Sequence, residues 1–302
     1  MAPAVGVDVH DVILEPDAAG LLARAVDAGL DHLTVGDHIS FHDGTGFDGL
    51  VSATAALTMQ QRLPVHVGVY QLALRHPVPV ARQLATISQL APGRLVLGVG
   101  VGGEDRSEVL NCGVDPATRG RRLDESLRVL RALAGGKPVD HDGEFFQLAA
   151  ATIRPAPDPP VPIVVGGRAD AAIRRAAELA DGWVGIFVAA RRFTDTVARV
   201  IEHAETVRRR PTWFGLNVWC GLDDSPAVAR ELLATRLSEL YRLPFERFER
   251  VCPAGTPEQV AEWLAPFVAA GCQHITLIPA ASGWAAGIDA AAEVRAHLHA
   301  IT

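Results

Sequence analysis

Arg94–Gly103 reads RLVLGVGVGG, and Pro162–Gly167 reads PIVVGG. Both are nearly continuous apolar runs that end in glycine. A β-strand that is covered on both faces has this pattern, whereas a half-exposed strand alternates apolar and polar residues. We therefore expect buried parallel strands here, each leading into a glycine-rich loop.

Six more runs of this kind occur along the chain: Ala4–Val9, His32–Asp37, Val65–Leu72, Gly182–Val188, Trp213–Leu222 and His274–Ile278. Most precede a stretch with helical spacing, and parallel neighbours need such crossovers. Arg119–Leu133 is the clearest helix, because its leucines recur at helical spacing. The pattern predicts an α/β fold, an eight-stranded (β/α)8 TIM barrel with loop insertions.

The 302 residues would suit two ordinary domains, but a barrel with insertions commonly fills this length alone. We expect one barrel domain over residues 1–302. Segments that fit neither strand nor barrel helix predict insertions near 38–47, 103–118, 135–160 and 241–255. The third reads as a hairpin that turns at Asp142-Gly143. Long excursions from a barrel are usually functional loops or lids.

Three later helix starts are also predicted. Ser225-Pro226 and Thr256-Pro257 each place a capping side chain before a proline, and Gln259 completes a capping box with Thr256. The last helix is expected over 288–300.

Composition excludes several classes of protein. The net charge is −7, and no basic run is longer than Arg208–Arg210, which argues against a nucleic-acid partner. No apolar stretch reaches membrane-spanning length, and Asp8 and Asp11 interrupt any signal-peptide pattern. We expect a cytoplasmic protein with no membrane partner. The four cysteines are widely spaced without a CxxC motif, so no metal site is predicted from them.

Asp37-His38 is the best acid–base candidate, because it lies at a strand end where barrel enzymes place catalytic groups. A histidine oriented by a carboxylate can move a proton at physiological pH. The alternative is an Asp that caps a helix beside a loop His. Asp8 and His10 offer a third possibility, a metal site, although no second close His pair supports it.

Two glycine motifs also have alternative interpretations. Gly166-Gly167-Arg168 precedes a helical stretch, so a phosphate could meet free N–H groups and a fixed cation there. The alternative is a tight turn with a surface Arg. The GxGxGG run at 98–103 could let a flat ring lie against the strand, or could serve helix–strand packing.

Five segments together resemble the bacterial luciferase-like family of flavin- and deazaflavin-dependent oxidoreductases. They are TVGDH (34–38), LRHPVPVARQLATISQLAPGRLVLGVGVGG (74–103), GVDPATRGRRLDESLRVLRAL (113–133), PIVVGGRADAAIRRAAELADGW (162–183) and GTPEQVAEWLAPFVAAGCQHITL (255–277). They occur in the family's order over nearly the whole chain. The resemblance implies a luciferase-like barrel with a cofactor ring across the strand ends.

The resemblance also implies site residues. The expected catalytic residues are His38, Asp37 and Glu104. The expected cofactor contacts are Asp37, Gly68, Val69, Gly102, Gly166, Gly167, Arg168 and Trp183. Relatives bulge the third strand against the ring, which implies a non-proline cis peptide at Gly68–Val69.

Two cofactors occur in the family. Coenzyme F420 transfers hydride to or from a small organic substrate, whereas reduced FMN and oxygen serve monooxygenation. The Asp-His pair favours F420, and FMN is the alternative, with a flavin reductase as partner. A homodimer is left open. Two further classes remain: a metal-dependent hydrolase with Asp8, His10 and His38 as ligands, and a non-catalytic barrel subunit. The sequence does not name the substrate.

Overall fold

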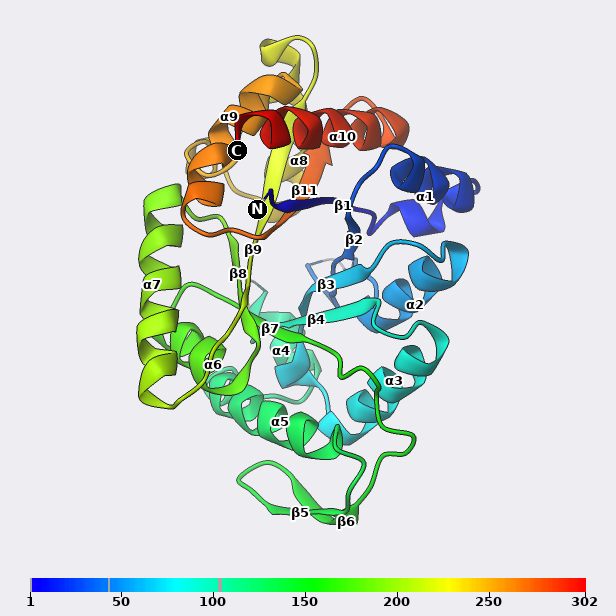
Figure 1. Ribbon diagram of the computed structural model, residues 1–302, viewed down its shortest axis with the longest axis vertical. Coiled ribbons are helices and arrows are strands. Elements are labelled where there is room, and N and C mark those ends of the chain that lie inside the picture. Colours follow the sequence, from blue (N-terminus) through cyan, green and yellow to red (C-terminus); the bar gives the residue numbers. More distant parts are fainter. Residues whose placement is uncertain (1, 43, 103–104) are drawn as a thin grey trace.

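A closed parallel barrel forms the centre of the molecule. The computed structural model describes residues 2–42, 44–102 and 105–302. Within these residues, eight parallel strands lie inside a ring of helices, which confirms the predicted TIM barrel (Figure 1). The barrel strands are β1 (Ala4–Asp8), β2 (His32–Val35), β3 (Val65–Tyr70), β4 (Leu95–Val99), β7 (Ile163–Gly166), β8 (Gly182–Ile186), β9 (Trp213–Leu222) and β11 (His274–Ala280). They pair in this order, and β11 pairs with β1 to close the ring.

The helices follow the expected alternation. They are α1 (Ala18–Asp27), α2 (Gly49–Met59), α3 (Pro77–Leu90), α4 (Arg106–Asn111), α5 (Arg119–Leu133), α6 (Asp170–Leu179), α7 (Ala190–Thr206), α8 (Pro226–Tyr241), α9 (Pro257–Ala269) and α10 (Trp284–Ile301). The bounds of α5 agree with the prediction. No helix in the described residues is long and apolar enough to cross a membrane.

Helix caps agree with the sequence in one case and differ in another. Thr256 and Gln259 form the predicted capping box at the start of α9. The Ser225 side chain makes no capping hydrogen bond, so that part of the prediction is wrong. The last helix begins at Trp284, four residues before the predicted start at Ile288, so the predicted start is wrong.

The core lies between the strands and the helices. Val5, Leu33, Val67 and Leu97 on neighbouring strands are at most 1 % exposed and belong to this cluster. Burial of each such side chain stabilises the fold by about 1.5–3 kcal/mol. A smaller cluster of Val96, Val164 and Val184 packs together with Val69.

Histidines gather near the amino-terminal ends of the strands. The rings of His32 and His66 stack with centroids 4.1 Å apart, and His274 stacks on Trp213 at 4.4 Å. His32 Nε2 lies 3.0 Å from Thr276 Oγ1. Burial lowers the pKa of His32 to about 3 and that of His274 to about 4, and it also lowers the pKa of His66. We call these three residues the floor histidines.

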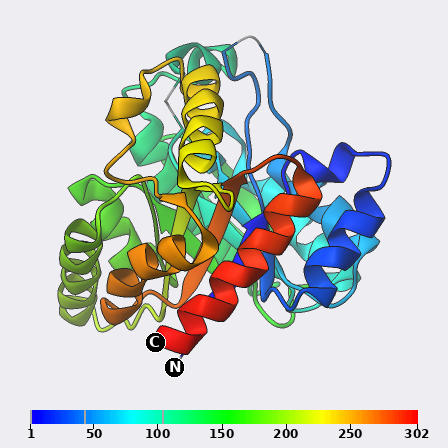
Figure 2. The same ribbon diagram turned by 90° about the horizontal axis from the view of Figure 1, so that it is seen from above.

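Several insertions lie at the opposite end of the barrel. Figure 2 shows α8 and the 241–255 segment on the side away from both chain termini. Trp219 of β9 packs with Leu237 of α8 and with Phe245 and Phe248 of that segment, which anchors them to the strand ends. The 135–160 insertion contains the predicted hairpin, β5 (Val139–Asp142) and β6 (Gln147–Ala151), which projects from the barrel beyond α5 (Figure 1). The short strand β10 (Ala254–Gly255) extends the sheet beside β9.

Candidate active site at the strand ends

Strand β3 is irregular where it reaches the carboxyl end of the barrel. Its register with β4 shifts between Val67 and Tyr70. The Gly68–Val69 peptide bond is cis, which confirms the prediction made from the family resemblance. Asn217 of β9 donates from Nδ2 to the Gly68 carbonyl oxygen at 3.3 Å, so the irregular backbone is tied to the far side of the barrel.

Three glycines surround the Val69 side chain. A Cβ at Gly98 would lie 3.1 Å from Val69 Cγ1, one at Gly166 would lie 3.0 Å from it, and one at Gly100 would lie 2.8 Å from Cγ2. A Cβ at Gly98 would also lie 2.4 Å from the Val67 carbonyl oxygen. Gly98 and Gly100 therefore accommodate β3, and the suggestion that the glycines of the 98–103 run admit a flat ring stays a prediction. The result is a compact apolar surface across the strand ends.

Both carboxylate oxygens of Asp37 accept hydrogen bonds from neighbouring groups. Its two carboxylate oxygens accept bidentate bonds from Arg75 at 2.8 Å each, and bonds from the Gly49 and Gln71 amides at 2.8 Å each. Burial raises the pKa of Asp37, and the Arg75 charge opposes that rise. Four donors with no remaining polar contact indicate an ionised, structural carboxylate.

This geometry corrects the role expected for Asp37. We expected it to fix the tautomer of His38, but no hydrogen bond joins the two side chains among the described residues. The Asp37 side chain is 0 % exposed, so it cannot touch a cofactor in this conformation. Its bonds instead hold β2, β3 and the start of α2 in register.

Glu108 on α4 takes the position next to His38. His38 Nδ1 lies 3.3 Å from Glu108 Oε2 and 3.1 Å from Gln71 Nε2. Glu108 Oε1 accepts from the Ile39 and Ser40 amides at 2.6 and 3.1 Å. Burial opposes ionisation of Glu108, but the bonds from His38, Gln71 and these amides lower its pKa to about 2. An ionised carboxylate therefore contacts Nδ1.

The hydrogen-bond network assigns the His38 tautomer. The two Gln71 amide hydrogens can bond the Asp37 carbonyl oxygen at 3.2 Å and Glu108 Oε2 at 3.0 Å. His38 Nδ1–H can then donate to Glu108, and every donor in the network has an acceptor. Nε2 is left as the acceptor of the ring. Nε2 has no hydrogen-bond partner among the described residues, and 32 % of the His38 side chain is exposed.

Sequence reasoning missed Glu108. The motif offered Glu104 as the acid after strand four, but Glu104 lies outside the described residues, as does Gly103. Glu108 stands in a short helix beside apolar Val109 and Leu110, and this spacing alone does not separate a buried carboxylate from a surface one. The positive-φ glycine Gly102 lies beside the same network, where a Cβ would be 2.5 Å from Gln71 Oε1.

The glycine loop after β7 has the features of an anion site. Gly167 has φ +128°, and a Cβ there would lie 2.9 Å from the Ala172 Cβ, so only glycine fits without strain. Trp183 Nε1 donates to the Gly167 carbonyl oxygen at 2.8 Å. The Trp183 ring is 0 % exposed. It therefore supports the loop from beneath, instead of touching a cofactor as we expected.

Two helix N-termini follow this loop and the next one. The N-cap residues of α6 and α7 are Ala169 and Ala189, and neither helix has a side-chain cap. Their first N–H groups are thus left for another acceptor. Exposed Arg168 donates to the Phe187 carbonyl oxygen at 3.4 Å, and Arg192 donates to the Arg168 carbonyl oxygen at 3.0 Å. These contacts join the two loops and place two cations beside them.

The alternative metal site is not formed. His10 Nδ1 accepts from the Gly36 amide at 3.2 Å, and burial raises the pKa of Asp8 to about 7. Both features oppose binding of a cation between them. In residues 2–42, 44–102 and 105–302, no group of three or more His, Cys, Asp or Glu side chains is placed to hold a metal. The hydrolase hypothesis therefore lacks a ligand set there.

Comparison with known proteins identifies the family. A family model described as luciferase-like monooxygenase matches residues 15–274. The chain belongs to the luciferase-like monooxygenase family. Among curated relatives of this luciferase-like protein, an F420-dependent glucose-6-phosphate dehydrogenase of Beutenbergia cavernae is 32 % identical over 227 residues, which cover 73 % of this chain and 68 % of that protein. Several other curated relatives match over about half of their own length, 50 or 51 %.

Solved structures share the luciferase-like barrel. One is an F420-dependent secondary alcohol dehydrogenase in complex with an F420-acetone adduct, with a TM-score of 0.86, 24 % identity and 99 % coverage of both chains. Another is the oxygenating constituent of 3,6-diketocamphane monooxygenase of Pseudomonas putida, in complex with FMN. Its TM-score is 0.76, with 18 % identity, and the match covers 99 % of this chain and 98 % of that chain. At these identities the likeness shows the fold alone.

Proposed function

We propose that the protein is an oxidoreductase that transfers hydride between coenzyme F420 and a small organic substrate. The observation that carries this proposal is His38, whose Nδ1 contacts the Glu108 carboxylate while Nε2 has no hydrogen-bond partner among the described residues. A curated relative that matches 73 % of the chain is named F420-dependent, which supports this cofactor. A cytoplasmic location remains an expectation.

The loop geometry fits a cofactor phosphate. The backbone of Gly166 and Gly167, the uncapped starts of α6 and α7, and the guanidinium of Arg168 would hold it. The buried Trp183 would keep the loop in place through the Gly167 carbonyl. When bound, F420 supplies a carbon that accepts or gives hydride, and it does not activate oxygen.

His38 supplies the proton chemistry. A secondary alcohol that loses hydride must also lose its hydroxyl proton, and a carbonyl that gains hydride must gain one. Nε2 accepts or returns this proton, while the Glu108 carboxylate stabilises the imidazolium through Nδ1. His38 and Glu108 form an ion pair only while His38 carries the extra proton. Glu108 therefore favours transfer of the proton from the substrate to His38.

An FMN-dependent monooxygenase is the alternative, because the loop suits any phosphate and an FMN-bound neighbour shares the fold. Titration of the protein with F420 and with FMN, followed by fluorescence, separates the two. We expect micromolar or tighter binding of F420 and weaker binding of FMN. Tight FMN binding with no change in F420 fluorescence would instead favour the monooxygenase.

Replacement of Glu108 by Gln tests the role of His38 more directly. The variant keeps the size of the side chain and an oxygen for the Ile39 and Ser40 amides, but removes the charge at Nδ1. We expect kcat to fall and both limbs of its pH profile to move to lower pH, because the carboxylate that stabilises the imidazolium is lost.

Glu262→Gln, an exposed carboxylate on α9, is the matched control and should leave the profile unchanged. A Glu108→Gln profile that shows lower kcat without any displacement would assign Glu108 a purely structural role.

A further inference from the structure

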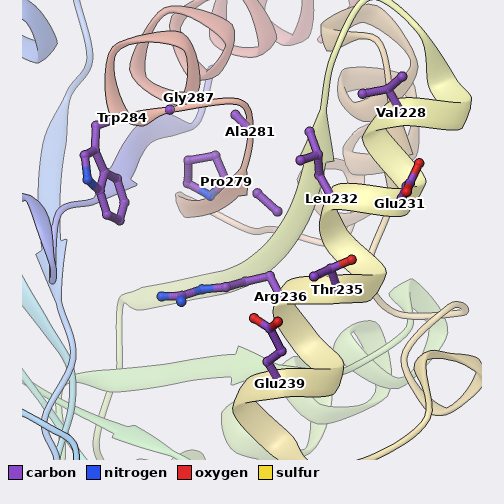
Figure 3. Close-up of a pocket in the computed structure, with 12 residues that line it drawn as sticks. Val228, Glu231, Leu232, Thr235, Arg236, Glu239, Pro279, Ala281, Trp284 and Gly287 are labelled. Atoms are coloured by element: carbon purple, nitrogen blue, oxygen red, sulfur yellow. The ribbon is translucent and has the colours of Figure 1, made fainter.

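A cavity opens at the carboxyl end of the barrel, between α8 and the start of α10 (Figure 3). The cavity has a volume of about 400 Å³. Its walls are largely apolar: Val228 and Leu232 line it from α8, and Pro279 and Trp284 line it from the other side. Trp284 Nε1 donates to Glu15 Oε1 at 3.1 Å, which fixes the plane of the indole. The cavity is large enough for a small organic molecule.

The cavity adjoins the strand ends. Pro279 and Ala280 are the last residues of β11, and in a parallel barrel all strand ends meet on one face. Arg236 of α8 reaches the loop after β1, where its Nη2 lies 2.8 Å from Asp11 Oδ2. Burial lowers the pKa of His10 in this region, and the charges of Asp11, His38, Asp37 and Arg236 also act on it.

The charges around the cavity are unbalanced. Arg236 is the one cation among the described residues that line it, and Asp11 already neutralises this guanidinium. Glu231 and Glu239, also on α8, line the cavity and have no ion-pair partner within residues 2–42, 44–102 and 105–302. A ligand in this cavity consequently meets apolar walls and surplus negative charge.

We propose that the cavity receives the part of the substrate that does not react, and that it takes a neutral or cationic molecule with an apolar body. A sugar phosphate would bring its charge toward two unpaired carboxylates, and among the described lining residues it would find no cation that is not already paired. This inference rests on the proposed oxidoreductase function, since that function supplies the reacting part of the substrate. It gives α8 the role of a specificity-determining helix.

A matched pair of fluorescent probes tests the charge preference. N-phenyl-1-naphthylamine is neutral, and 8-anilinonaphthalene-1-sulfonate has the same aromatic skeleton with an added sulfonate. We expect the neutral probe to bind the full-length protein about tenfold more tightly, which corresponds to about 1.4 kcal/mol. Trp284→Ala should weaken binding of the neutral probe, and Trp284→Phe should retain it, because a flat wall is kept. Equal or tighter binding of the sulfonate would overturn the proposal.

Removal of the two carboxylates should change the affinity of the anionic probe only. In a Glu231→Gln, Glu239→Gln double variant, we expect the sulfonate to bind severalfold more tightly and the neutral probe to bind as before. Glu202→Gln, which removes an exposed carboxylate from α7 outside the cavity, is the matched control and should change neither affinity. A double variant that binds the sulfonate no better than the unaltered protein would contradict the assignment.

Two measurements on the holoenzyme separate this inference from the proposed function. F420 binding is titrated independently of the probes, so failure to bind F420 would reject the proposed function and leave the probe ratio intact. With F420 loaded, glucose 6-phosphate serves as the anionic test compound. We expect no reduction of F420 by it, and ready reduction would overturn the proposed substrate class without affecting the cofactor assignment.

Discussion

Acidification from pH 7 to pH 5 should destabilise the fold through the floor histidines. His32 is 1 % exposed, and burial lowers its pKa to about 3, whereas an unfolded histidine titrates near its ordinary value of about 6.5. Between these two values, the unfolded chain binds a proton that the folded chain does not. The contribution of His32 to stability is therefore fully present above about pH 6.5 and is lost as the pH falls toward 3.

The size of the effect follows from the unfolded pKa. At pH 5, about 1.5 pH units below that value, His32 alone removes about 2 kcal/mol from the free energy of unfolding. The pKa values of His66 and His274 are shifted in the same direction, so these residues add to the loss. Asp8 acts in the opposite sense, because burial raises its pKa to about 7 and the folded state then binds the proton first.

A comparison of variants isolates the histidine from Asp8. Urea denaturation at pH 7 and at pH 5, followed by tryptophan fluorescence, gives the loss of stability for each protein. In His32→Gln this loss should be about 2 kcal/mol smaller than in the unaltered protein. His297→Gln, which alters an exposed histidine, is the control and should show the full loss. An unchanged loss in His32→Gln would refute the reasoning, whatever the stability of that variant at pH 7.

Two further predictions concern the site. Gly167→Val should weaken F420 binding at least about tenfold while circular dichroism shows an intact barrel, because φ +128° and the nearby Ala172 Cβ exclude a side chain at this loop; unchanged affinity would make the loop a simple turn. His38→Asn should lower turnover by about two to four orders of magnitude with little change in F420 affinity; normal single-turnover chemistry at saturation would make His38 a binding contact.

The architecture could be predicted because it depends on local patterns that repeat. Each barrel strand is an apolar run, and its burial on both faces requires the helices that follow it. The four leucines of α5 show why helix bounds agree with the sequence when spacing and burial coincide. The start of α10 was missed because Trp284 and its neighbours are helical without being strongly apolar on one face.

The site was predicted only in part, because its contacts join distant segments. Sequence placed His38 at a strand end correctly, but the neighbouring Asp37 is the wrong carboxylate for it. Asp37 turns toward Arg75, which lies 38 residues away, and Glu108 approaches His38 from 70 residues away. Nothing in the adjacency of two residues indicates which direction each side chain takes after a strand ends.

The packing of Val69 limits which substitutions can be accepted one at a time. Its two methyl groups occupy space that Gly98, Gly100 and Gly166 leave open, so a methyl group added at any of these glycines would collide with Val69 or force it to move. A smaller residue at position 69 would instead leave a gap next to Val96 and Val164. Positions 69, 100 and 166 should therefore change together during evolution, and a library that varies them jointly should recover folded barrels that single substitutions do not reach. Gly98 should stay fixed, because a Cβ there would also lie 2.4 Å from the Val67 carbonyl oxygen.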